Sequence, residues 1–163
     1  MRLLMLLLGV LFSTASFSQT EKITDLLYKQ FLREQKMYGK DAVDMPVLLQ
    51  PFQIKNDTLS AAFIIRSESA PEEILYSYRK VSIHDIEAFI KDMNVLFTAN
   101  EGSVQEVNII KDRDGAVLET RKNTSHLFFT ELGRDAKDES LRRKMLQAFE
   151  RAGYNIISEY WFN

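Results

Sequence analysis

The stretch VQEVNIIKDRDGAVLETRK, Val104–Lys122, decides the fold class of this chain. Two runs with the composition of strands, Val104–Lys111 and Ala116–Lys122, flank the turn sequence Asp112–Gly115. Asp-Gly between two such runs is a strong short-range signal for a β-hairpin. Because parallel strands need a crossover of a dozen residues or more, this stretch predicts antiparallel pairing.

Further strand candidates lie on both sides of the hairpin. Short links at Asn100–Ser103 and Asn123–Ser125 join it to its neighbours, so we expect residues 95–132 to form an antiparallel meander. Pro51 cannot donate to a sheet ladder, and its strand therefore belongs at an edge or is broken there. The remaining candidates are Val47–Ile54, Leu59–Arg66, Ile74–Val81, Val95–Ala99, His126–Leu132 and Tyr154–Phe162.

Three segments have apolar residues at helical spacing. The first is Glu21–Tyr38, the second begins at Ser82, and the third, Leu141–Ala152, is ended by Gly153. Strands and helices are grouped along the chain rather than alternating. This order predicts an α+β domain with a mostly antiparallel sheet of seven or eight strands and three helices packed on one face. The apolar residues that form one stripe along each predicted helix are, in chain order, Ile23, Leu26, Leu27 and Phe31; Ile83, Ile86, Ile90 and Met93, with Phe89 next to this stripe; and Leu141, Met145, Ala148, Phe149 and Ala152.

The chain opens with the apolar segment MRLLMLLLGVLFSTASFSQ. Its unbroken apolar run, Leu3–Phe12, is about half the roughly twenty residues that a membrane-spanning helix needs. Arg2 before the run and small residues after it are typical of a secretory signal peptide. We expect residues 1–18 to be removed by cleavage after Ser18, or alternatively after Ala15, leaving residues 19–163 as a single α+β domain. The other interpretation, a buried N-terminal core helix, is disfavoured by Gly9 and the polar run that follows.

The chain has no cysteine. Small secreted eukaryotic domains usually depend on disulfides, so an exported protein without them suits a bacterial periplasm or exterior better. The same absence excludes a cysteine nucleophile, a thiolate metal site and a lipidated N-terminal cysteine. We therefore expect a periplasmic or secreted protein whose mature chain has no integral membrane span.

Charge argues against nucleic acid as a partner. The formal net charge is −2, and the loss of Arg2 with the leader makes it −3. The densest basic run, Arg142–Lys144, follows acidic residues at Asp135, Asp138 and Glu139, as expected of a solvated helix with acids in its first turn. Nucleic-acid binding usually needs a concentrated basic face, which the linear sequence does not show.

No arrangement of residues singles out catalysis, a metal or a cofactor. The two histidines, His84 and His126, are far apart and have no metal-ligand spacing around them. A Gly-x-Ser-x-Gly elbow and a glycine-rich phosphate loop are both missing. Carboxylates could in principle supply a glycosidase-like pair. Those considered are Glu68, Glu72, Glu73, Glu131, Asp135, Asp138, Glu139 and Glu159.

Aromatic residues are the best candidates for binding. Tyr76 and Tyr78 share one face of their strand, and Tyr160 and Trp161 lie near the end of the chain. Tyrosine and tryptophan bury well while keeping a polar tip in water, and they are enriched where proteins hold partners. Core packing is the alternative role for all four. Those that face outward are expected to line a binding surface.

These observations favour an exported, non-enzymatic binding protein that engages another protein or an envelope component. A small hydrolase that uses carboxylates on envelope glycans is the alternative, and it requires two carboxylates in one cleft, at least one with a raised pKa. An inhibitor or immunity-type protein is a third possibility, for which size and compartment are the only support.

Overall fold

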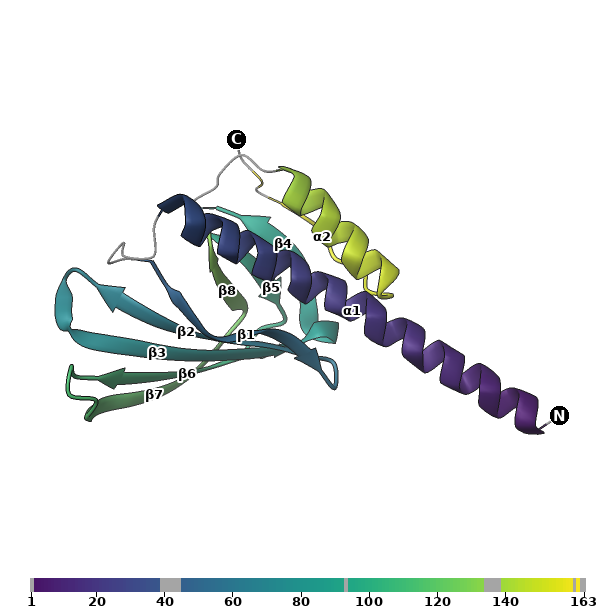
Figure 1. Cartoon of the computed structure of the whole chain (residues 1–163), viewed down its shortest axis with the longest axis horizontal. Coiled ribbons are helices and arrows are strands. Elements are labelled where there is room, and N and C mark those ends of the chain that lie inside the picture. Colours follow the sequence, from purple (N-terminus) through teal and green to yellow (C-terminus); the bar gives the residue numbers. More distant parts are fainter. Residues whose placement is uncertain (1, 39–44, 93, 134–138, 160, 162–163) are drawn as a thin grey trace.

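The computed structural model describes residues 2–38, 45–92, 94–133, 139–159 and 161, with side chains described from Gln19 onward. Eight strands form two antiparallel sheets, and two α-helices pack against them (Figure 1). The predicted α+β class with antiparallel strands is therefore confirmed. The predicted number of three helices is wrong, because the structure has two.

The larger sheet, sheet A, has five strands in the order β1-β2-β3-β6-β7, and the smaller sheet, sheet B, has the order β4-β5-β8. The hairpin predicted at Asp112–Gly115 joins β6 to β7, and there the Asp112 carboxylate accepts a hydrogen bond of 2.8 Å from the N–H of Ala116. The strands are β1 Val47–Lys55, β2 Thr58–Ser67, β3 Ala70–Ser82, β4 Ile86–Lys91, β5 Val95–Ala99, β6 Val104–Lys111, β7 Val117–Ser125 and β8 Leu127–Leu132.

The expected meander over residues 95–132 is wrong outside this hairpin. β5 and β6 follow each other in the chain but lie in different sheets, and β5 pairs with β8 instead. The reason is burial on both faces: Val95, Leu96 and Phe97 are all buried. Such a strand needs a partner on each side and cover on each face, whereas β6 leaves one face to solvent.

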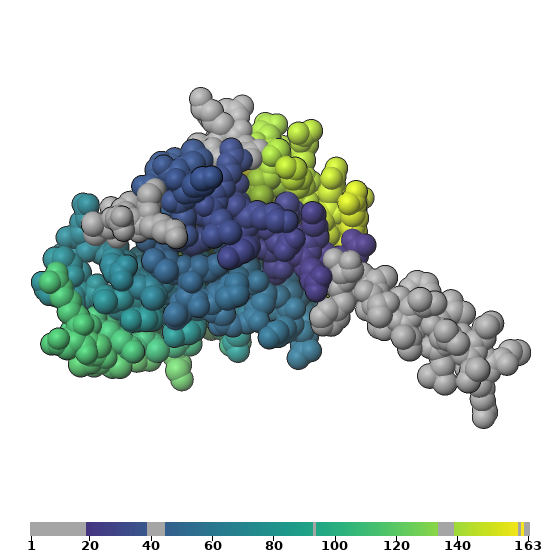
Figure 2. Space-filling model, in the orientation of Figure 1, coloured from purple at the N-terminus to yellow at the C-terminus, as the bar shows by residue number. Residues whose placement is uncertain are grey.

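The two helices match two of the three predicted stripes. α1, Arg2–Tyr38, buries Ile23, Leu27 and Phe31 among its described side chains, and α2, Glu139–Arg151, buries Leu141, Met145, Ala148 and Phe149. α1 packs along β1 of sheet A, and α2 lies beside α1 and contacts β4 of sheet B (Figure 2). Among the described residues, no helix is both long and apolar enough to cross a membrane.

The helix predicted from Ser82 is the clearest error. Ile83–Asp85 forms one turn of 3₁₀ helix, and β4 follows at once. The hydroxyl of Ser82 accepts a bond from the N–H of His84, as a cap for this single turn. Ile83, Ile86 and Ile90 fit helical spacing, but β-branched residues also favour strands. Antiparallel pairing of Phe89 with Phe97 and of its neighbours along β5 decides for the strand. Met93 lies outside the described residues.

The final strand predicted over Tyr154–Phe162 is also wrong. Among the described residues of this segment, only an isolated parallel bridge between Ala88 and Ile157 forms; the N–H of Phe89 donates to the Ile157 carbonyl at 2.9 Å, and the N–H of Ile157 donates to the Glu87 carbonyl at 3.0 Å. This bridge covers the free edge of β4 without extending sheet B. The segment alternates between half-buried and exposed side chains, so it lies along the surface rather than inside a sheet.

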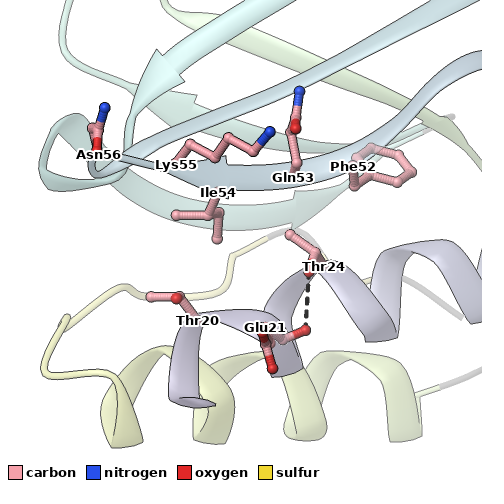
Figure 3. Close-up of a pocket in the computed structure, with 8 residues that line it drawn as sticks. All are labelled: Thr20, Glu21, Thr24, Phe52, Gln53, Ile54, Lys55 and Asn56. Atoms are coloured by element: carbon pink, nitrogen blue, oxygen red, sulfur yellow. Dashed lines mark hydrogen bonds between the residues drawn. The ribbon is translucent and has the colours of Figure 1, made fainter. Parts of the chain in front are cut away.

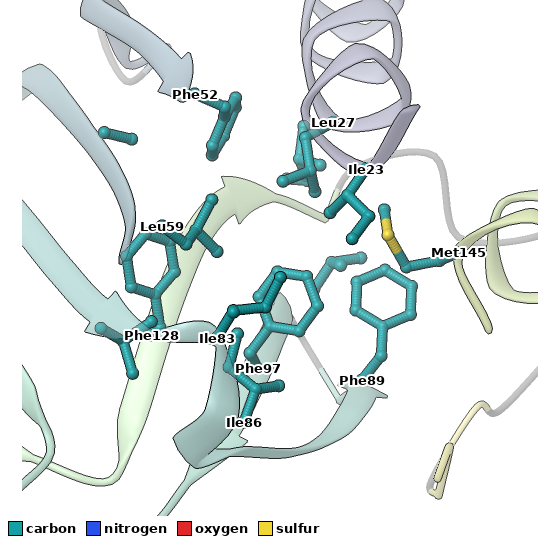
Figure 4. Packing of buried hydrophobic residues seen from close by; sticks show 14 of the residues in the cluster. Ile23, Leu27, Phe52, Leu59, Ile83, Ile86, Phe89, Phe97, Phe128 and Met145 are labelled. Carbon is teal, nitrogen blue, oxygen red and sulfur yellow. The ribbon is translucent and has the colours of Figure 1, made fainter. Parts of the chain in front are cut away.

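Phenylalanine side chains dominate the core between the two sheets and the helices (Figure 4). The ring of Phe97 lies 5.0 Å from Phe89, 5.6 Å from Phe149 and 6.4 Å from Phe128, measured between centroids. One face of sheet A contributes Leu59 and Phe63 to this core. The other face of sheet A remains available for a site.

Candidate functional site

The site lies on the side of sheet A that points away from the core, which we call the outer face. Successive side chains of a strand alternate between faces, so the register assigns every residue. On β3, Ser77 and Arg79 are buried and Tyr78 and Lys80 are exposed. The cross-strand rows of the outer face are Ser60, Lys80, Gln105 and Thr124; Ala62, Tyr78, Val107 and Lys122; Ile64, Tyr76, Ile109 and Thr120; and Arg66, Ile74, Lys111 and Val117.

These rows contain cations and no carboxylate. The four cations are Arg66, Lys80, Lys111 and Lys122. The ammonium of Lys111 lies 4.9 Å from the centre of the Tyr76 ring, within range of a cation–π interaction. Neither Lys80 nor Lys122 has an ion-pair partner among the described residues. Within these four rows an anion therefore meets no carboxylate; Glu72, farther along β3, is paired with Arg113 at 2.7 Å.

A hollow of about 430 Å³ opens on this face around Tyr78. The Tyr78 side chain is 38% exposed; Lys80 lies two residues further along β3, and Lys122 lies in the row of Tyr78 on the far side of Val107. Strand and row spacings place the Cα atoms of these two lysines roughly 12 Å apart. The lining combines a phenol ring, amides, a hydroxyl and ammonium groups, and its residues are Gln50, Ser60, Ala61, Tyr78, Arg79, Lys80, Gln105, Val107 and Lys122.

The structure brings together two of the four predicted binding residues. Tyr76 and Tyr78 lie on the outer face in adjacent rows, as their alternation indicates. Trp161 lies elsewhere and packs on the core, with its ring 5.2 Å from Phe89. Its indole N–H is buried and has no hydrogen-bond partner among the described residues. Tyr160 lies outside the described residues.

The cations beside Tyr78 were missed at the sequence level. They are scattered through the chain, and a search for a linear basic run does not find them. The signal that could have found Lys80 is the alternation Tyr76-Ser77-Tyr78-Arg79-Lys80, which puts it on the face of the tyrosines. Placing Lys122 on that face also needs the β3–β6 pairing, which sequence alone does not supply.

The inner face of sheet A carries a second polar cluster, centred on Arg79. Its Nε donates to Glu106 at 2.7 Å, and its Nη1 donates to the Phe129 carbonyl at 2.8 Å and to the Glu131 carboxylate. The guanidinium also lies 5.3 Å from the centre of the Phe63 ring. Because Glu131 belongs to β8, these bonds tie sheet A to sheet B.

The charges of this cluster fit a structural role, in which Arg79 holds the two sheets together. Burial by itself raises the pKa of Glu106, but the hydrogen bond and positive charge of Arg79 outweigh it, with further hydrogen bonds from Ser77 and Asn108. The pKa of Glu106 is therefore held below its usual range. A general acid for glycoside hydrolysis needs the opposite shift, because it must keep its proton near neutral pH.

Another hollow, of about 470 Å³, lies between residues 20–24 of α1 and the end of β1 (Figure 3). Thr20, Glu21 and Thr24 face Phe52–Asn56 across it, and the hydroxyl of Thr24 donates back to the Glu21 carbonyl at 2.9 Å. Its charged groups, Glu21 and Lys55, are of opposite sign, so the hollow has no bias toward a cation or an anion.

The remaining sequence candidates for chemistry are dispersed. The Nε2 atom of His84 lies 3.6 Å from the Asp57 carboxylate, and the Nδ1 atom of His126 lies 3.3 Å from the Glu101 carboxylate. Each histidine is therefore next to a different exposed carboxylate, and the two do not form one site. Within the described ranges no group of three His, Cys, Asp or Glu residues could hold a metal ion. Among the carboxylates considered for catalysis, Asp135 and Asp138 lie outside the described residues.

No protein-family model, no curated protein and no solved structure matches this chain. Its function is therefore inferred from the surface described above.

Proposed function

We propose that this is an exported, non-enzymatic binding protein that holds a component of the cell envelope on the outer face of sheet A. The observation that carries the proposal is the hollow around Tyr78, whose lining includes Lys80 and Lys122 and contains no carboxylate. Exposed aromatic residues next to unpaired cations are typical of surfaces that hold partners.

Export is supported by the short apolar leader and by the position of the first core contacts. Among the described side chains of α1, the first buried one is Ile23, four residues beyond the proposed new N-terminus at Gln19. Cleavage after Ser18 would therefore leave Ile23, Leu27 and Phe31 in place. The mature protein would then fold in the periplasm or outside the cell, consistent with the absence of cysteine.

The alternative of a carboxylate hydrolase finds no support in the described residues. Glu106 and Glu131 converge on one guanidinium, and the pKa of Glu106 is lowered. Neither carboxylate lines the hollow at Tyr78. No observation singles out an inhibitor or immunity role either, so a binding protein remains the function that the geometry supports best.

Binding is tested by sedimentation with envelopes isolated from the native cell. Tyr78→Ala is expected to weaken the affinity for envelopes about tenfold, because a well-placed aromatic anchor contributes on the order of 1–2 kcal/mol. Tyr28→Ala is the matched control, since Tyr28 is 42% exposed and lies on α1, away from the outer face. Equal binding by both variants, with unchanged melting temperatures, would refute the proposal.

Export is tested by sequencing the N-terminus of the protein recovered from its native cell. We expect the mature chain to begin at Gln19. Recovery from the cytosol with Met1 still present would overturn the proposed compartment, whatever the binding experiment shows.

A further inference from the structure

We propose that the ligand of the outer face is an acidic polysaccharide, whose sugar ring lies on Tyr78 and whose acidic groups reach Lys80 and Lys122. This inference rests on the proposed function of the face and adds the chemical class of the ligand. It follows from the lining of the hollow, the spacing of its cations and the shape of the surface.

The neutral polar groups of the hollow match sugar hydroxyls. Gln50 and Gln105 each offer an amide with both donors and an acceptor, and Ser60 offers a hydroxyl. The Tyr78 ring presents an apolar face with a polar tip, which suits the apolar face of a pyranose. A ligand rich in hydroxyl groups can satisfy all of these partners at once, whereas a purely apolar one would leave them unpaired.

The two lysines add a requirement for negative charge. Lys80 and Lys122 are without carboxylate partners in the described chain, and their Cα atoms are roughly 12 Å apart. A monomeric acidic sugar cannot place a separate acidic group at each of the two lysines. A chain with repeated acidic groups can place one at each lysine. Arg66 on β2 and Lys111 on β6 offer two further cations at the other end of the outer face.

The shape of the surface at Tyr78 argues against insertion into a membrane there. Ala62, which pairs with Tyr78, is 0% exposed, and the surface around Tyr78 is hollowed rather than raised. Insertion into a lipid interface needs protruding apolar side chains. A hollow accepts a ligand that projects into it, as a sugar ring does.

The experiment measures the affinity of the purified protein for defined probes by isothermal titration calorimetry. The acidic probe is polygalacturonate, the neutral control is dextran, and monomeric galacturonate tests the need for two acidic groups. Binding of polygalacturonate alone supports the inference. Equal binding of dextran would overturn the requirement for charge, and equal affinity for the monomer on a per-sugar basis would overturn the two-lysine contact.

Matched variants locate the binding. Lys80→Gln and Lys122→Gln together are expected to weaken binding of polygalacturonate about tenfold, and Lys144→Gln, an exposed lysine on α2, is expected to leave it unchanged. Raising the salt concentration should remove most of the difference, because exposed charges are screened. An equal loss with Lys144→Gln would indicate nonspecific attraction and overturn the assignment of the site.

Further probes separate this inference from the proposed function. Vesicles containing anionic phospholipid and single-stranded oligothymidylate are offered in the same assay. Tighter binding of either than of polygalacturonate would overturn the polysaccharide while leaving the outer face as the binding surface. If envelope binding persists in Tyr78→Ala, the proposed function itself fails.

Discussion

Replacing Arg79 by Met tests whether the cluster of Arg79, Glu106 and Glu131 holds the two sheets together. The side chain of Arg79 is 8% exposed, and those of Glu106 and Glu131 are 25% and 19% exposed. Met keeps most of the buried stem but leaves two carboxylates without their cation. Removing one partner of a fully buried ion pair costs about 3–5 kcal/mol. Because both carboxylates keep some contact with solvent, we expect the lower end, about 3 kcal/mol of unfolding free energy.

The loss of unfolding free energy in Arg79→Met should come mainly from the carboxylates of Glu106 and Glu131, which no longer have a cation. Adding Glu106→Gln and Glu131→Gln to Arg79→Met removes both charges and keeps side chains of similar size. Leaving a buried charge uncompensated costs more than leaving a neutral amide there, so the triple variant should be more stable than Arg79→Met, though less stable than the parent because Phe129 loses its donor. A variant that merely lost packing would not recover in this way.

Urea denaturation followed by circular dichroism measures these free energies. Arg121→Met is the matched control, because Arg121 forms a two-pronged ion pair with Glu119 at 2.6 and 2.5 Å, but on the exposed strand β7. Its stability is expected to match that of the parent, since exposed ion pairs contribute little. If Arg79→Met costs less than about 1 kcal/mol, or if the triple variant is no more stable than Arg79→Met, a charge-based tie between the sheets is refuted.

Three further outcomes follow from particular residues. The lowered pKa of Glu106 means that its contribution to stability is present above its unfolded pKa, the ordinary value of a glutamate, and is lost as the pH falls through the lower folded pKa. Urea midpoints between neutral pH and pH 3 should therefore fall less in Glu106→Gln than in the parent. Phe97→Ala removes a ring that is 0% exposed and in contact with other rings, and it should cost about 3–5 kcal/mol in the same assay, whereas Leu118→Ala, at a side chain that is 55% exposed, should change stability by less than about 0.5 kcal/mol. Gly153 ends α2 at a φ of 88° with nothing within 4 Å of an added Cβ, so Gly153→Ala should lower stability by about 1–2 kcal/mol through backbone strain alone, and an unchanged melting temperature would contradict this.

Short-range sequence patterns predicted the helices and the hairpin, whose defining contacts lie between residues close together in the chain. The turn at Asp112–Gly115 determined the β6–β7 hairpin, and helical stripes beginning at Ile23 and at Leu141 identified α1 and α2. The error at Ile83–Ile90 has a physical cause, because isoleucines at this spacing satisfy both a helical stripe and a strand that is buried on both faces. Only pairing with β5 distinguishes the two, and that pairing is a tertiary contact.

Pairing between distant strands, and hence most of the site, was not accessible from sequence. Arg79 lies 27 residues from Glu106 and 52 residues from Glu131, and no local pattern brings them together. The register between β3 and β6 likewise places Tyr78 opposite Val107, and the β6–β7 register puts Lys122 in the same row beyond Val107. The division into two sheets follows from burial of β5 on both faces, which a short apolar run does not reveal.

The alternation along β3 also explains why net charge is a poor guide to what this chain binds. Arg79 and Lys80 are neighbours in sequence but face opposite sides of sheet A. On the inner face the cation is compensated by Glu106 and Glu131, so it contributes to the tie between the sheets and is not offered to a ligand. On the outer face the rows hold no carboxylate, so the cation remains available. A formal net charge of −2 averages over both faces. It conceals a local positive potential at Lys80 and Lys122, which is what an approaching anion experiences within a Debye length of the surface.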